Sequence, residues 1–374
     1  MSIYMDNAAT TAQKPAVVSE SIKKILQGDY GNSSRGAHGY SLASYHVVEN
    51  ARNQIKDLFQ ASEQYEVAFT NNATVALNEV LKGMIHPGDH VITTSWEHNS
   101  VLRPLYQLEA QGVLLDIISS EPISGRLNYD EFLRKLRPTT KVVICNHASN
   151  VTGNLLDLAR IKAFCVQHNL FLIIDASQTA GAVPIDLSDG KISALCFTGH
   201  KSLYGPQGTG GVCIKKDVPI EPVLTGGDGM QSFSKVQPQV LPTLLEAGTL
   251  NIPGLAGLAA SVEWLKSKDS NSNLGEYFYQ EAKKITGLTT YGDFSAPRVD
   301  VFSINLRGAE SAIVSDLLWE EFKIATRPGY HCAPLMHEAL NTADRGTVRI
   351  SFSCFTTKKE VDHVLTALKN LASR

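Results

Sequence analysis

Two residues with the potential for amino-acid chemistry follow short apolar runs of the sequence. Asp175 comes directly after the run 170–174, and Lys201 comes shortly after the run 194–197. Apolar runs of this length predict buried strands, and in a parallel sheet ligands bind beyond the carboxyl ends of the strands. If the two strands are neighbours, both side chains face one crevice. Taken singly, Asp175 is also compatible with a helix cap, and Lys201 with a solvated lysine at the rim of the sheet.

A lysine and a carboxylate in one crevice are the pair that an aldehyde cofactor requires. The amine forms a Schiff base with pyridoxal phosphate, and the carboxylate pairs with the pyridinium nitrogen. The phosphate group needs backbone amides, which the N-terminus of a helix supplies. The segment 70–74 lies between a predicted strand and a predicted helix, and Thr198 and His200 stand close to Lys201. The sequence therefore predicts a site for pyridoxal phosphate.

Two further apolar runs also end in polar residues. His98 follows the run 90–95, and a histidine at this point could stack on the cofactor ring and exchange protons. From its position alone, His98 is equally well interpreted as a capping or surface histidine. The polar residues 146–152 follow the run 141–145 and could hold the carboxylate of a substrate.

The positions of these residues depend on an alternation of strands and helices between about residues 45 and 215. Strands are predicted at 66–70, 90–95, 113–119, 141–147, 170–176, 194–200 and 211–215. The spacing of apolar residues predicts helices at 45–59, 74–85 and 158–168. Because the strand runs are apolar throughout, the alternation predicts an α/β fold with a mostly parallel sheet that helices cover on both faces.

The remainder of the chain differs in character. Residues 216–250 are rich in Gly and Pro, which predicts a long irregular connection that is functional or lies at an interface. A helix is predicted at 252–267. From about residue 275 the sequence mixes strands with helices, which predicts a smaller α+β unit. Its elements are expected at 299–306, 309–321, 347–352 and 359–371.

The composition limits the class of protein. The chain has 374 residues, which suggests about two domains. Its hydrophobic share of 43% and its net charge of −3 argue against disorder, and the charge also argues against nonspecific binding to nucleic acid. No apolar run is long enough to span a membrane and the N-terminus lacks the pattern of a secretory signal, so we expect a cytoplasmic protein. The six cysteines show no CxxC spacing, so no metal site is predicted.

Seven segments in order along the chain resemble one known family, over residues 4 to about 371. They are DNAATT at 6–11, WEHNS at 96–100, SNVTG at 149–153, DASQ at 175–178, GHKSLYGPQGTG at 199–210, EAGTLN at 246–251 and RPGYHCAP at 327–334. Together they resemble the cysteine desulfurase and selenocysteine lyase family, in the class V aminotransferase group. The resemblance implies the fold type I of pyridoxal-phosphate-dependent transferases, with a seven-stranded, mostly parallel sheet. It further implies a large cofactor-binding domain at 15–260 and a small domain formed by 1–14 and 261–374.

The resemblance also implies roles for individual residues. Lys201 forms the Schiff base and moves the Cα proton, Asp175 keeps the pyridine nitrogen protonated, and His98 stacks on the ring as a possible acid–base group. The other residues implied to bind the cofactor are Ala73, Thr74, Gln178, Thr198, His200 and, reaching across from the second subunit of a homodimer, Thr249. Asn150 and Arg349 match the positions that hold the substrate carboxylate. The chain departs from many family members at Asn71–Asn72, within the phosphate-binding segment.

Cys332 differs from the other five cysteines in its surroundings, because it lies in a Gly-containing segment with Arg327 and His331 nearby. Positive neighbours favour the thiolate, which is the nucleophilic form. In the family, the matching residue attacks the sulfur of the cofactor-bound cysteine and becomes a persulfide, while alanine leaves. The implied activity is that of a cysteine desulfurase acting on L-cysteine. The short connection from Cys332 to Arg349 is similar to that of members with a compact cysteine loop, which often use a dedicated sulfur-acceptor protein.

Other interpretations stay open at this point. Cys332 could be a structural cysteine in a loop. The same residues are compatible with a selenocysteine lyase acting on L-selenocysteine, or with another class V aminotransferase or C–S lyase activity. A non-catalytic scaffold or sulfur-carrier protein that retains the fold is a further possibility.

Overall fold

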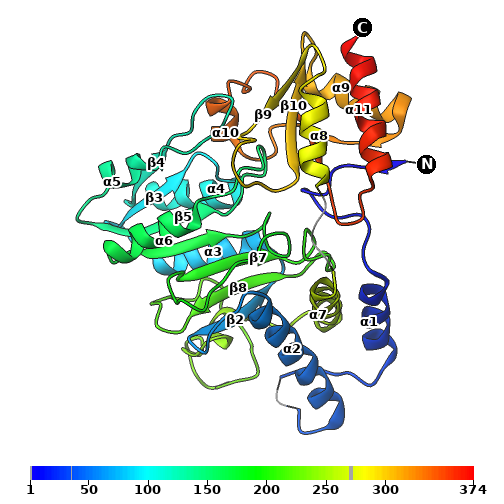
Figure 1. Cartoon of the computed structure of the whole chain (residues 1–374). Coiled ribbons are helices and arrows are strands. Elements are labelled where there is room, and N and C mark those ends of the chain that lie inside the picture. The colour runs from blue at the N-terminus through cyan, green and yellow to red at the C-terminus, as the bar shows by residue number, and fades with distance from the viewer. Residues whose placement is uncertain (1, 35, 269–272) are drawn as a thin grey trace.

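The computed structural model describes residues 2–34, 36–268 and 273–374, and a seven-stranded sheet lies at its centre (Figure 1). In spatial order the strands are β2 (Tyr65–Thr70), β8 (Gly210–Lys215), β7 (Ala194–Thr198), β6 (Phe171–Asp175), β5 (Thr140–Asn146), β3 (His90–Thr94) and β4 (Leu114–Ile118). Neighbouring strands are parallel except where β8 pairs with β2 and β7, to which it runs antiparallel. The predicted strands and the mostly parallel sheet are therefore confirmed.

Helices cover both faces of this sheet because the side chains of each central strand alternate between two hydrophobic cores. In β5, Val143 and Cys145 belong to one core, and Val142 and Ile144 belong to the other. The first core includes residues of α2 (Gly39–Leu58), α6 (Leu158–Gln167) and α7 (Ile252–Lys266), and the second includes residues of α3 (Ala73–Met84) and α4 (Asn99–Glu109). A strand that is buried on both faces needs apolar residues at every position, so its sequence is a continuous apolar run.

A smaller antiparallel sheet lies at the C-terminal end of the chain. Its strands, in spatial order, are β12 (Arg327–Gly329), β13 (Thr347–Ser351), β10 (Val301–Leu306) and β9 (Leu288–Tyr291). A third core joins this sheet to α8 (Leu274–Ala282), α9 (Ser311–Phe322) and α11 (Lys358–Ala372). The N-terminal strand β1 (Ile3–Tyr4) pairs in parallel with β11 (Ile324–Ala325), and Met5 belongs to the third core. The third core lies wholly within residues 1–14 and 261–374, and on this basis we propose a small domain at 1–14 and 261–374 and a large domain at 15–260; the first core also includes Tyr291 and Met336, which join the two.

The structure differs from the predictions mainly at the ends of elements. α2 begins at Gly39 rather than near residue 45, because Nδ1 of His38 caps it by accepting the amide of Ser41 at 3.3 Å. Histidine is not among the favoured capping residues, so this start has no sequence signal. β7 ends at Thr198 and β10 begins at Val301, each two residues inside its predicted range.

Several short elements complete the fold. The helices α1 (Ala16–Gln27), α5 (Asp130–Arg134) and α10 (Pro334–Ala339), together with α4 and α8, lie outside the predicted helical ranges. Within 216–250, a stretch that the structure describes throughout, the one helical or strand element is a 3₁₀ turn at Thr243–Leu245, so the irregular connection is confirmed. None of the helices in the described ranges is long and apolar enough to cross a membrane.

A buried ion pair fixes the irregular connection to the large sheet. Arg52 on α2 donates from Nη2 to Oε2 of Glu246 at 2.6 Å and from Nη1 to Oε1 at 2.8 Å. Oε1 of Glu246 also accepts the amide of Phe69 at 2.7 Å. Both charged side chains are less than one tenth exposed. Removing Glu246 would leave Arg52 with the more exposed Glu49, at 3.2 Å from its Nε, as its acidic partner and would remove the bidentate contact that compensates most of its buried charge.

We expect Glu246→Ala to lower the free energy of unfolding by about 3–5 kcal/mol, the usual cost of breaking a buried ion pair. Urea unfolding followed by circular dichroism measures this loss. The matched control is Glu321→Ala, which removes an exposed bidentate partner of Arg374 and is expected to change stability little. Equal losses in the two variants would contradict the prediction.

Candidate active site

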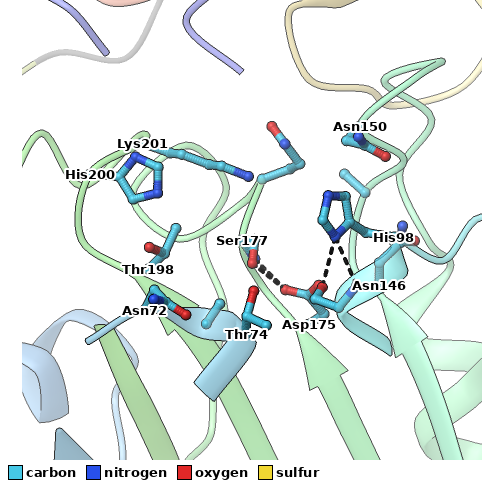
Figure 2. Close-up of a pocket in the computed structure, with 14 residues that line it drawn as sticks. Asn72, Thr74, His98, Asn146, Asn150, Asp175, Ser177, Thr198, His200 and Lys201 are labelled. Carbon is cyan, nitrogen blue, oxygen red and sulfur yellow. Dashed lines mark hydrogen bonds between the residues drawn. The ribbon is translucent and has the colours of Figure 1, made fainter. Parts of the chain in front are cut away.

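The carboxyl ends of the parallel strands border a cavity (Figure 2). The strands β6 and β7 are neighbours, with Asp175 opposite Cys196, so Asp175 and Lys201 line the same cavity. Its lining consists of Asn72, Ala73, Thr74, His98, Ser100, Asn146, Ala148, Asn150, Asp175, Ser177, Gln178, Thr198, His200 and Lys201. Of the predicted site residues, Thr249, Cys332 and Arg349 do not line the cavity, and all the others do.

Burial and mutual attraction shift the pKa values of Asp175 and Lys201 in opposite directions. Asp175 is buried, and its Oδ1 accepts the amide of Ser177 at 2.9 Å as well as the hydroxyl of Ser177. Burial raises the pKa of the Asp175 carboxyl, while the bonds from Ser177 and the charge of Lys201 counteract the rise. Burial also lowers the pKa of Lys201 to about 8, against the attraction of Asp175. An appreciable fraction of the lysine is therefore neutral at physiological pH, which suits a nucleophile or a base.

His98 both caps a helix and lines the cavity. Its Nδ1 accepts the amide of Ser100, the second residue of α4, at 3.0 Å. Because Nδ1 is an acceptor, the proton of the neutral ring lies on Nε2. Burial, followed by the charge of Lys201, lowers the pKa of His98 to about 4. The two interpretations of His98 are therefore compatible, and the residue is a neutral imidazole.

One side of the cavity has donors suited to an anion. The first amides of a helix have no partner within that helix, and α3 begins with Ala73 and Thr74 at the cavity wall. Figure 2 shows Thr198 and His200 on the same side as Asn72, which caps α3 through a 3.0 Å bond from the amide of Val75. Oγ1 of Thr198 and Nδ1 of His200 are buried and lack a hydrogen-bond partner among the described residues. Amides, a hydroxyl and an imidazole are typical phosphate-binding groups.

These features fit pyridoxal phosphate. Buried polar atoms without a partner are rare, so the two at Thr198 and His200 point to a polar ligand beside them. The lysine and the buried carboxylate lie in the same cavity as this anion subsite. The described ranges contain no group of three His, Cys, Asp or Glu side chains that could hold a metal ion.

Arg349 does not line the cavity but contacts Asn150, which does. Its Nη1 donates to the carbonyl of Asn150 at 3.2 Å, and its Nη2 donates to Oδ1 of Asp6 at 2.9 Å. Nε of Arg349 and Oδ1 of Asn150 are buried and lack partners among the described residues. Gln178 lies elsewhere on the wall, where its Nε2 donates to the carbonyl of Ala8 at 3.1 Å.

Cys332 lies outside the cavity in an exposed turn that is docked onto the cavity wall. Its carbonyl accepts the amide of Asn99, the residue after His98, at 2.7 Å. The carbonyl of the preceding residue, His331, accepts Nδ2 of Asn150 at 2.8 Å. His331 and Cys332 have φ values of 50° and 56°, a region that residues with side chains seldom adopt. Two consecutive residues in this conformation are typical of a strained functional turn.

The remaining cysteines divide into two groups. Cys145, Cys165, Cys196 and Cys213 are buried, and burial raises the pKa of each thiol. Cys354 is exposed in the turn after β13, although its partial burial also raises its pKa. Sequence patterns alone did not distinguish this second exposed cysteine from those in the strands.

Thr249 lies in an exposed stretch beyond the Glu246 ion pair and away from the cavity of its own chain. Its assignment to the cofactor of a second subunit therefore stays a prediction. Asn72, Asn146 and Ala148 line the cavity within the segments 70–74 and 146–152 that the sequence indicated. Two further lining residues, Ser100 and Ser177, are not among the predicted site residues. Each lies two residues after a candidate, His98 or Asp175, and bonds back to it, which is a recurrent local pattern of short polar side chains.

Comparisons with known proteins agree with this architecture. The model of the class-V aminotransferase family matches residues 3–364. A probable cysteine desulfurase of Pyrococcus abyssi is 30% identical over 99% of this chain and 94% of that protein, and one of Methanothermobacter thermautotrophicus is 29% identical over the same shares. The apo structure of a cysteine desulfurase from Thermococcus onnurineus has a TM-score of 0.92 at 28% identity, covering 100% of this chain and 95% of that one. For the cysteine desulfurase CsdA of Escherichia coli, the TM-score is 0.88 at 27% identity over the same shares. The chain therefore belongs to the class-V aminotransferase family, among its cysteine desulfurases.

Proposed function

We propose that the protein is a pyridoxal-phosphate-dependent cysteine desulfurase, which converts L-cysteine to L-alanine and receives the sulfur on Cys332. The main support is the docking of the cysteine turn onto the cavity wall. The amide of Asn99, next to His98, bonds the carbonyl of Cys332 at 2.7 Å. An exposed thiol is thereby held beside a cavity that contains a lysine, a buried carboxylate and an anion subsite.

Different residues of the cavity would contact different groups of the cofactor. Lys201 would hold the aldehyde through its amine, Asp175 would bond the protonated ring nitrogen, and Gln178 would bond the phenolate oxygen. His98 would stack on the ring as a neutral imidazole. The phosphate would lie against Thr198, His200 and the first amides of α3, at Ala73 and Thr74. When bound, pyridoxal phosphate supplies an electron-withdrawing ring that stabilises negative charge at the Cα of an attached amino acid.

Lys201 is the base that we assign to the Cα proton. A general base works best when its pKa lies near the working pH, and the pKa of Lys201 is lowered to about 8. The nitrogen that removes the proton can also return it. Two other acid–base groups of the cavity are less suited to this task, because Nδ1 of His98 accepts a hydrogen bond from Ser100 and Oδ1 of Asp175 accepts one from Ser177.

Arg349 and Asn150 are assigned to the carboxylate of the substrate. A guanidinium binds a carboxylate through two parallel N–H bonds, and Nε of Arg349 has no acceptor among the described residues. Asn150 lines the cavity and bonds Arg349 through its carbonyl at 3.2 Å. Together they would hold the substrate with its Cα toward Lys201 and its sulfur toward Cys332.

The sulfur transfer balances without an external oxidant. The thiolate of Cys332 attacks the sulfur of the substrate, so an S–S bond forms while the C–S bond breaks. The electron pair of the broken bond goes to Cβ, which is then protonated and becomes the methyl group of alanine. The terminal sulfur of the Cys332 persulfide leaves when a second thiol attacks it, on an acceptor protein or on an added dithiol.

We also propose that the protein forms a homodimer in which Thr249 reaches the phosphate subsite of the second subunit. The irregular connection that ends at Thr249 exposes large apolar side chains at Val223, Leu224, Phe233, Val236 and Val240. The start of α2 adds exposed side chains at Tyr40, Leu42 and Tyr45. Apolar side chains exposed along this connection are what a second subunit would cover if it lay against the segment that leads to Thr249.

The function is tested by incubating the purified holoenzyme with L-cysteine and a dithiol. We expect alanine and sulfide to form in equal amounts, because each turnover releases one of each. A C–S lyase would instead release pyruvate and ammonia with the sulfide, and an aminotransferase would leave the sulfur on carbon. Pyruvate in place of alanine would overturn the proposal.

A further inference from the structure

The N-terminal segment 6–14 connects the small sheet to the cavity. At its beginning, Asp6 forms a parallel bridge with Ser351, and the amide of Ala8 donates to Oγ of Ser351 at 2.8 Å. Further along, the carbonyl of Ala8 accepts Nε2 of Gln178, and the amide of Thr11 donates to the carbonyl of His200 at 3.1 Å. Figure 1 shows this part of the chain running from beside α11 toward α1. The DNAATT motif therefore spans from the strand of Arg349 to the wall of the cavity.

The guanidinium of Arg349 is nearly completely buried beside another cation. Its side chain is 2% exposed. On the neighbouring strand, Arg327 is its direct register partner, and like charges directly opposite each other are destabilising. Burial, and then the charge of Arg327, lower the pKa of Arg349, while Asp6 and Tyr4 raise it. Among the residues that the structure describes, Asp6 is the one acid within ion-pair distance of Arg349.

Asp6 also determines how much of the guanidinium is available. Its Oδ1 bonds Nη2 at 2.9 Å, and the carbonyl of Asn150 bonds Nη1 at 3.2 Å. These two bonds fix the plane of the group from two sides and leave Nε buried without an acceptor. A carboxylate that arrives at Nε would meet a guanidinium that is already oriented, so little conformational freedom is lost on binding.

We propose that Asp6 is a positioning residue for the amino-acid substrate: it holds the guanidinium of Arg349 in the orientation that binds the substrate carboxylate. This inference rests on the proposed function, in which Arg349 binds that carboxylate. Asp6 itself touches neither the cofactor nor the reacting atoms. Asp6 is also one of the charges that raise the pKa of Lys201, so the predicted effect is a difference: its removal weakens the binding of ligands that have a carboxylate far more than the binding of ligands without one.

The test compares L-alanine with ethylamine, which is L-alanine without its carboxylate. Binding of each to the holoenzyme is measured as a change in the visible absorbance of the bound cofactor. For Asp6→Asn we expect the dissociation constant of L-alanine to rise at least about tenfold, as for the loss of a hydrogen bond to a charged group, and that of ethylamine to change far less. The KM for L-cysteine is expected to rise similarly, with little change in kcat.

Three further variants make the result decisive. Asp362→Asn removes a surface partner of Lys358 and should leave the dissociation constants of both ligands unchanged. Asp6→Glu keeps the charge and should bind L-alanine more tightly than Asp6→Asn; if Asp6→Asn does not fold, a carboxylate-specific loss in Asp6→Glu supports the proposal. Arg349→Lys should weaken the binding of L-alanine and leave the binding of ethylamine unchanged.

Two results overturn the inference. Equal weakening of L-alanine and ethylamine in Asp6→Asn would mean that Asp6 is only structural. Unchanged L-alanine binding in Asp6→Asn, together with weak binding in Arg349→Lys, would reject Asp6 while leaving the proposed role of Arg349 intact. If Arg349→Lys also binds L-alanine normally, the proposed function itself loses its carboxylate site, and the inference about Asp6 falls with it.

Discussion

Lys201→Ala is expected to abolish the formation of alanine from L-cysteine and to remove the visible absorbance of the purified protein. The variant loses the amine that we propose to hold the cofactor and to move the Cα proton. Loss of a general base alone typically costs a factor of about 10²–10⁴ in rate, and here the covalent attachment is lost as well. We therefore expect turnover below detection, measured as alanine formed per enzyme under saturating L-cysteine and added pyridoxal phosphate.

The structure offers a matched control on the same domain. Lys191 is a surface lysine with a distant ion-pair partner, Asp189, at 3.6 Å, so Lys191→Ala should keep both the absorbance and the turnover. We expect the Lys201 variant to fold, because removal of a buried amine does not remove a core side chain. Thermal unfolding of the variant checks this. Normal turnover or unchanged absorbance in folded Lys201→Ala would mean that a different group holds the cofactor.

The sheet could be predicted from the sequence because its central strands are buried on both faces. A run such as 170–174 must then be apolar at every position, and the polar residue that ends it marks the edge where ligands bind. The order of the strands in the sheet could not be predicted from the sequence. The adjacency of β6 and β7 brings Asp175 and Lys201 into one cavity, and a strand order is a long-range property that no local pattern reports.

The parts of the site that escaped prediction depend on contacts between distant segments. The turn of Cys332 is held by a hydrogen bond that the backbone amide of Asn99 donates. The orientation of Arg349 depends on Asp6, which lies near the other end of the chain. Backbone donors and acceptors are present at every residue, so the sequence contains no signal for such a bond. The resemblance to known proteins implied roles for Cys332 and Arg349, but it left the start of the DNAATT motif without one.

Cys332→Ala is expected to lower alanine formation from L-cysteine at least about a thousandfold, since the variant loses the thiol that we propose as the nucleophile and acceptor of the sulfur. The visible absorbance should stay, because Cys332 does not line the cavity that holds the cofactor. Activity with L-selenocysteine should largely persist in the variant, since selenium leaves carbon without help from the thiol. The ratio of the two activities therefore isolates the sulfur-transfer step from cofactor binding and proton transfer.

Cys354→Ala is the control for this prediction, because Cys354 is the other cysteine that the described part of the chain exposes. Its thiol has a raised pKa and lies beside Tyr204, whose hydroxyl accepts the amide of Cys354 at 2.8 Å. A thiol that resists ionisation is a poor acceptor of sulfur, so this variant should desulfurate L-cysteine at the parental rate. Labelling with an electrophile that captures persulfides should mark Cys332 in the parent and in Cys354→Ala, and should be lost in Cys332→Ala. A persulfide on Cys354, or normal desulfuration by Cys332→Ala, would transfer the role to another thiol and would leave the strained turn at His331 and Cys332 without a catalytic reason.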